Sequence, residues 1–109
     1  MPKDNKSALK DYLFQAILTL ESVDECYDFF DDLCTIKEVD DMANRLCGAK
    51  MLTESMVYTD ITGQTGLSTA TISRINRCLK HGRGGYATAL ERLENRQIHR
   101  PEPGREKDE

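Results

Sequence analysis

The first half of the chain repeats one hydrophobic pattern in three successive segments. From residue 7 to residue 21, apolar residues recur at steps of three and four, which predicts an amphipathic helix. Similar apolar faces follow over residues 22–33 and 35–51. No stretch alternates apolar and polar residues between turn signals, so the pattern predicts an all-α fold with three helices in this half.

Two of these helices open with the sequence of a capping box. Ser22 is followed three positions later by Glu25, and Thr35 is followed in the same way by Glu38. In a capping box, the hydroxyl and the carboxylate accept hydrogen bonds from backbone N–H groups that the helix itself leaves free. The boxes therefore predict where the second and third helices begin.

Residues 58–79 have the anatomy of a helix-turn-helix. Gly66 stands where the first helix must end in a left-handed conformation, which glycine adopts without a Cβ penalty. Leu67 is expected to fill the angle between the two helices, and Ser68 to cap the second. The predicted seam between the helices consists of Ile61, Leu67, Ile72, Ile75 and Leu79.

The first helix of this motif is expected to be locally soft. Val57 stands at its cap position, where serine or threonine is preferred. Gly63 lies within the helix, at a cost of roughly 1 kcal/mol relative to alanine.

The seam leaves short polar and basic side chains facing outward. Short side chains at a helix N-terminus let the backbone approach base edges, and arginines farther along reach phosphates. Residues 61–85 contain four arginines or lysines and no acid, which disfavours a plain helical hairpin whose serines and threonines only cap and turn. The predicted contacts to double-stranded DNA are Tyr58, Thr59, Thr62, Ser68, Thr69, Ala70, Thr71, Ser73, Arg74, Arg77 and Lys80.

The last helix is predicted over residues 86–96, after a break at Gly84-Gly85. Its inward positions are Ala87, Leu90 and Leu93. Residues 97–109 contain two prolines, a glycine and mostly charges, so we expect a disordered tail. With 109 residues, the chain is expected to form one domain, residues 1–96, followed by this tail.

Charge is distributed unevenly along the chain, although the net charge is only -4. Residues 1–54 carry six lysines and arginines against twelve acids, whereas residues 55–100 carry seven against three. Such asymmetry is typical of a protein with one surface that faces a polyanion. A solvated helix face would give the same pattern, so charge alone leaves both readings open.

Other functional classes have little support in the sequence. The four cysteines, Cys26, Cys34, Cys47 and Cys78, are scattered singly, so no metal site is predicted and buried, reduced thiols are expected. No nucleophile with a nearby base and no phosphate loop is present, which argues against an enzyme. The apolar run over residues 12–20 is too short for a bilayer and lacks a cleavage site, so a cytoplasmic protein is expected.

Residues 35–93 resemble the tryptophan repressor superfamily, and especially its YerC/YecD group. The most specific part is the run Ser68-Thr69-Ala70-Thr71-Ile72-Ser73-Arg74 with Gly84-Gly85-Tyr86 downstream of it. The other matching residues are Met42-Ala43-Asn44-Arg45, Ala49-Lys50-Met51-Leu52, Gly66-Leu67, Asn76-Arg77-Cys78-Leu79 and Leu90-Glu91-Arg92-Leu93. The resemblance implies six helices in an intertwined homodimer and a transcriptional regulator, most simply a repressor.

The resemblance also implies a position for a small-molecule effector. In the tryptophan repressor, the indole lies between two arginines beside a glycine. Arg74 matches one arginine, whereas the other position aligns with Asn44, one residue before Arg45, and the glycine aligns with Ile75. Together with Cys78, these residues outline a possible effector site. The branched Ile75 side chain would occupy the indole space, so tryptophan is not expected to bind and no cofactor is predicted.

One alternative function stays open at this point. The same helices suit an interaction module that binds another protein through its acidic first half and does not bind DNA. Salt-sensitive affinity for DNA distinguishes the regulator from such a module.

Overall fold

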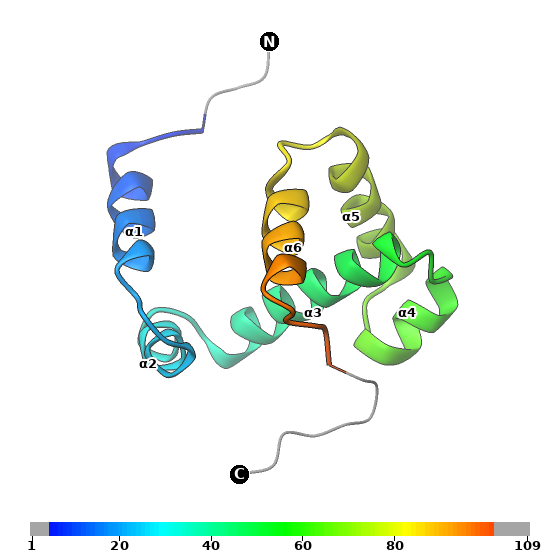
Figure 1. The fold of residues 1–109 in the computed structure, drawn as a ribbon, viewed down its shortest axis with the longest axis horizontal. Helices are drawn as coiled ribbons and strands as arrows, with labels where there is room; N and C mark the ends of the chain where they lie inside the picture. The colour runs from blue at the N-terminus through cyan, green and yellow to red at the C-terminus, as the bar shows by residue number, and fades with distance from the viewer. Residues whose placement is uncertain (1–4, 102–109) are drawn as a thin grey trace. The chain divides into compact units, whose positions relative to one another are not determined.

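The computed structural model describes residues 5–101, which form six α-helices joined by short connections (Figure 1). No strand occurs in this range, which confirms the predicted all-α class. The elements are α1 Ala8–Leu18, α2 Val23–Leu33, α3 Ile36–Thr53, α4 Tyr58–Thr65, α5 Thr69–His81 and α6 Gly85–Asn95. None of these helices is long and apolar enough to cross a membrane.

The predicted capping box at Thr35 is complete, whereas at Ser22 the glutamate carboxylate accepts from the residue before the cap and not from the cap residue itself. The Glu25 N–H donates to the Ser22 hydroxyl at 3.1 Å, and the Glu25 carboxylate accepts from the Glu21 N–H at 2.8 Å. At the start of α3, the Glu38 N–H donates to Thr35 Oγ1 at 3.1 Å and the Thr35 N–H donates to the Glu38 carboxylate at 2.8 Å. Each box supplies acceptors for N–H groups that have no partner within the helix.

The chain divides after Val39 into two compact units. In the first unit, no side chain of residues 5–39 is buried. Its helices nevertheless carry large apolar side chains, and Leu9, Tyr12 and Leu18 are 84%, 80% and 77% exposed. A single copy of the chain therefore leaves much of the apolar surface of α1 open to water. The single domain expected over residues 1–96 stays a prediction.

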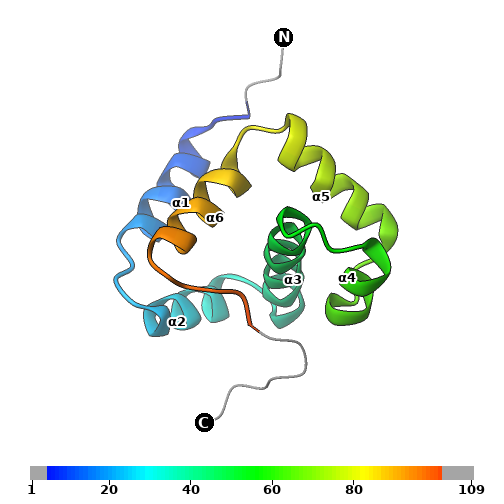
Figure 2. The same cartoon turned by 45° about the vertical axis from the view of Figure 1, so that its right-hand side comes forward.

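The core of the second unit is built around α3, which lies between α6 on one side and α4 with α5 on the other (Figures 1 and 2). One cluster joins Ala49, Ile75 and Leu90, from α3, α5 and α6. A second joins Met51, Ile61 and Ile72, from α3, α4 and α5. The partly buried Leu67 packs against both clusters, and Leu79 packs against the first. The predicted seam of the helix-turn-helix is thus confirmed.

The turn between α4 and α5 also has the predicted geometry. Gly66 adopts φ +77°, and its N–H donates to the Thr62 carbonyl at 2.8 Å. Ser68 caps α5, since its hydroxyl accepts from the Thr71 N–H at 3.1 Å. Val57 provides no side-chain cap for α4, as expected.

Helix α3 ends in a Schellman motif without a glycine. Ser55 adopts φ +64°, a conformation that favours glycine. The Met56 N–H donates to the Met51 carbonyl at 3.1 Å, and the Ser55 N–H donates to the Leu52 carbonyl at 3.0 Å. Met56 packs against the cluster that contains Met51, which is the hydrophobic contact that accompanies this motif.

Helix α6 ends in the same way, and residues 97–101 of the predicted tail contact the rest of the second unit. Gln97 adopts φ +61°, and the Ile98 N–H donates to the Leu93 carbonyl at 2.9 Å. Arg100 then forms an ion pair with Glu54 at 2.8 Å. These contacts give residues 97–101 a defined place beside α3, whereas residues 102–109 of the expected tail lie outside the described residues.

Two expectations about burial are wrong. Cys26 and Cys78 are exposed, and Cys34 and Cys47 are only half-buried, because the helix faces that carry them are incompletely covered. On α6, Leu90 is buried and Leu93 half-buried as predicted, but Ala87 is exposed.

Candidate nucleic-acid interface

Helix α5 presents one exposed face and one buried face. Ile72 and Ile75 are buried, whereas Ala70, Ser73 and Arg77 are exposed at steps of three and four, on one side of the helix. The predicted DNA contacts whose side chains are exposed are Thr59, Ser68, Thr69, Ala70, Ser73, Arg74, Arg77 and Lys80.

The other three predicted contacts are half-buried. Tyr58 packs against the cluster of Met51, Ile61 and Ile72. Thr62 Oγ1 is buried and has no hydrogen-bond partner within residues 5–101, while Thr71 Oγ1 accepts from the Ser68 hydroxyl at 3.1 Å. These side chains point into the motif or support its cap, so a DNA contact from Thr62 requires its side chain to rotate.

The surface of α5 is strongly basic. No acid occurs between Asp60 and Glu91, and Arg74, Arg77 and Lys80 are exposed along the helix. Lys80 and His81 lie in the last turn, where the helix dipole favours positive charge. An anion that approaches this face meets several cations and no carboxylate from α5 itself.

Four of the five predicted effector residues surround one small cavity. It has a volume of about 60 Å³ and is lined by Arg45, Thr71, Arg74, Ile75, Cys78 and Tyr86. Ligand pockets in proteins usually measure about 300–1,000 Å³, so this space is too small for an indole ring as it stands. Ile75 is 3% exposed and packs with Ala49 and Leu90, so it belongs to the core as much as to the cavity.

Asn44 lines a different and larger hollow instead. This hollow measures about 500 Å³ and lies among α3, α4, α6 and residues 98–101. Most of its lining is apolar, with Leu46, Leu93 and Ile98 among the contributors. Burial raises the pKa of the half-exposed Cys47 thiol in this hollow; the charge of Arg100 acts to lower that pKa, and the charge of Glu54 acts to raise it.

Sequence reasoning overlooked three residues near these sites. Tyr86 lines the small cavity, although its motif was recognised. Gly48 lies against the turn of the helix-turn-helix, and the only available signal was a glycine within a helix. Arg100 carried no signal, because its partner Glu54 is 46 positions away.

Comparison with known proteins places these features in a family. Residues 8–94 match the family described as Trp repressor protein. The uncharacterized protein YerC from Bacillus subtilis (strain 168) is 53% identical over 83 residues, which are 76% of this chain and 80% of YerC.

Two crystal structures share the fold. A TrpR-like protein from Eubacterium eligens ATCC 27750 has a TM-score of 0.79 and 52% identity over 82% of this chain and 92% of that one. A Trp repressor candidate from Staphylococcus aureus has a TM-score of 0.78 and 47% identity over 82% of this chain and 89% of that one. The helix-turn-helix, its basic face and these matches agree: the chain belongs to the Trp repressor protein family, in its YerC group.

Proposed function

We propose that the protein is a sequence-specific DNA-binding transcriptional regulator that places α5 in the major groove. The observation that carries this proposal is the two-sided character of α5. One side of the helix packs into the core through the buried Ile72 and Ile75. The opposite side exposes short polar side chains followed by arginines. Membership of the Trp repressor protein family supports the same conclusion.

Position along α5 separates the proposed roles of its side chains. Thr69, Ala70 and Ser73 lie in the first turns, where a recognition helix touches base edges. Arg77 and Lys80 lie nearer the C-terminus, where their charges neutralise phosphates and supply much of the affinity. The regulator is proposed to act in the cytoplasm as a repressor that blocks promoter access.

A homodimer completes the proposal. Leu9, Tyr12 and Leu18 of α1 are largely exposed, and the hollow of about 500 Å³ in the second unit is lined mainly by apolar side chains. Burial of such surfaces in a second copy contributes about 25 cal/mol per Å² of apolar area. Two-fold symmetry would also present two copies of α5 to half-sites about one turn of DNA apart.

Light scattering combined with size-exclusion chromatography tests the dimer. We expect twice the 12.4 kDa mass of one chain at micromolar concentration. Replacing Leu9 and Tyr12 together with serine should lower the measured mass, since both side chains lie open in a single copy. A wild-type protein that stays at the mass of one chain contradicts the dimer.

Selection of bound fragments from a genomic DNA library, followed by gel shifts, tests the DNA-binding role. Arg77→Glu should abolish binding to the selected fragment, whereas Thr69→Ala should change site preference more than affinity. Arg96→Glu makes the same charge change at an exposed position outside the helix-turn-helix and serves as control. Unchanged binding by both α5 variants would exclude α5 as the recognition helix, and protein partners without DNA affinity would favour an interaction module.

A further inference from the structure

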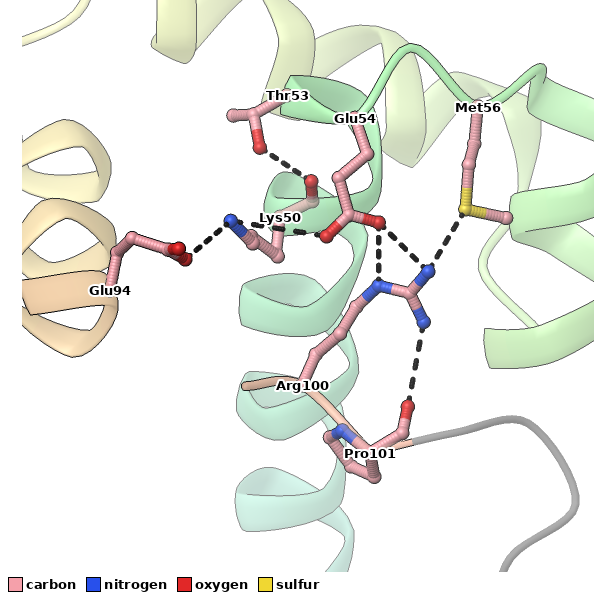
Figure 3. Close-up of polar contacts among 7 residues, drawn as sticks. All are labelled: Lys50, Thr53, Glu54, Met56, Glu94, Arg100 and Pro101. Atoms are coloured by element: carbon pink, nitrogen blue, oxygen red, sulfur yellow. Dashed lines mark hydrogen bonds and ion pairs between the residues drawn. The ribbon is translucent and has the colours of Figure 1, made fainter. Parts of the chain in front are cut away.

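Arg100 joins the C-terminal segment to the turn before the helix-turn-helix (Figure 3). Its Nε and Nη2 atoms lie 2.9 Å and 2.8 Å from the same carboxylate oxygen of Glu54. Nη2 also lies 3.4 Å from Sδ of Met56. The guanidinium group thus contacts the residues on both sides of Ser55, whose positive φ makes this turn strained.

A second ion pair ties the same region to α6. Lys50 Nζ lies 3.4 Å from Glu94 and 3.9 Å from Glu54, so Glu94, Lys50, Glu54 and Arg100 form one connected series (Figure 3). The side chains of Lys50 and Arg100 are only 24% and 21% exposed. Glu54 is 36% exposed, so the Arg100–Glu54 pair is screened less by solvent and salt than a pair on an open surface. Glu94 is 57% exposed, so the Lys50–Glu94 pair contributes less.

Helix α4 depends on contacts from outside itself. It has only eight residues, no side-chain cap at Val57, and Gly63 in its interior. An isolated helix of this length is unstable in water, so packing and the preceding turn must hold it in place. The turn that Arg100 contacts, over residues 54–57, is the one that leads directly into α4.

We propose that residues 97–101 form a strap and that Arg100 is a positioning residue for the helix-turn-helix. By holding Glu54 and Met56, Arg100 fixes the turn before α4 and so limits the motion of α4 against α3. The consequence for DNA affinity rests on the proposed function above. The consequence for the mobility of α4 does not depend on DNA.

Neutralising Glu54 distinguishes a positioning role of the Arg100–Glu54 contact from a direct effect of the Glu54 charge on DNA affinity. Glu54→Gln removes a negative charge, which by charge alone would tighten DNA binding. Glutamine keeps an oxygen that can accept from Arg100 but loses the attraction between opposite charges, so the strap is weakened and we expect a rise in Kd of about twofold to fivefold. Glu91→Gln, which neutralises an exposed carboxylate on α6, is the matched control and should not raise Kd. Tighter binding by Glu54→Gln would overturn the strap.

Two further measurements complete the test. In hydrogen exchange without DNA, the amides of α4 should exchange several-fold faster in Glu54→Gln and Arg100→Gln, with those in the middle of α5 unchanged. The conservative variant Arg100→Lys, which keeps a positive charge opposite Glu54, should exchange more slowly than Arg100→Gln. Unchanged exchange in both glutamine variants would overturn the proposal. A wild-type protein that binds no DNA would overturn only the proposed function. The positioning role of Arg100 would still be tested by the hydrogen-exchange measurement.

Discussion

Gly48 of α3 lies directly against Leu67 in the turn of the helix-turn-helix. A Cβ atom added at Gly48 would stand 2.9 Å from Cδ1 of Leu67 and 3.8 Å from side-chain atoms of Ile61 and Ile75. A glycine within a helix costs stability, so its presence here is explained by the close approach that it permits. This contact seats the turn of the DNA-binding motif on α3.

A larger side chain at residue 48 should displace the motif. We expect Gly48→Val to lower the free energy of unfolding by about 1 to 3 kcal/mol, because overpacking moves Leu67 and its neighbours. The same change at Gly63, where an added Cβ meets nothing within 4 Å, should alter it by less than about 0.5 kcal/mol. Urea denaturation measures both, and equal losses at the two glycines would contradict the assigned contact.

Glycine should stabilise the two left-handed helix ends. Ser55 and Gln97 adopt φ +64° and +61°, which L-residues reach only with strain. We expect Ser55→Gly and Gln97→Gly each to raise the free energy of unfolding by about 0.5 to 1 kcal/mol in thermal or urea denaturation. Alanine at either position, which lacks this freedom, should give no gain; a gain with alanine equal to that with glycine would argue against the motif.

Local signals in the sequence predicted much of this structure. The capping boxes at Ser22 and Thr35, the glycine turn at Gly66 and the cap at Ser68 each depend on residues within a few positions of one another. Propensity and pattern are reliable at that range, and the spacing of isoleucines and leucines then gave the seam between α4 and α5.

Contacts between distant segments were not predictable in this way. Ser55 and Gln97 close helices without the glycine that marks such ends, and Arg100 meets Glu54 only after the chain has folded. Exposure of Cys26 and Cys78 also depends on which surfaces pack together, because an apolar helix position is buried only if another element covers it. Spacing along one helix does not contain that information.

Tryptophan should not bind with micromolar affinity. Ile75 fills the core beside a cavity of only about 60 Å³, which leaves no room for an indole next to Arg74. Calorimetric titration of the protein with tryptophan should therefore give no heat of binding. A micromolar dissociation constant would show that this region opens further than the structure indicates.

The Cys47 thiol should be slow to react at neutral pH. Burial raises its pKa, and only the thiolate attacks alkylating reagents, so its rate should keep rising at a pH where an ordinary thiol has levelled off. Iodoacetamide labelling followed by peptide mass spectrometry gives the rate at each pH, with a short cysteine peptide as reference. If the labelling rate of Cys47 levels off at the same pH as that of the peptide, or at a lower pH, the result contradicts the assigned burial.

The salt dependence of DNA binding by Arg77→Ala tests the central claim most directly. Fluorescence anisotropy between 50 and 200 mM salt should show wild-type affinity falling linearly on logarithmic axes, because phosphate contacts release counterions. Arg77→Ala should reduce that slope by about one unit. Ser73→Ala, which changes a side chain proposed to lie next to base edges, should leave the slope unchanged. Affinity that does not vary with salt, or a slope unaltered by loss of Arg77, would contradict the placement of α5 on DNA.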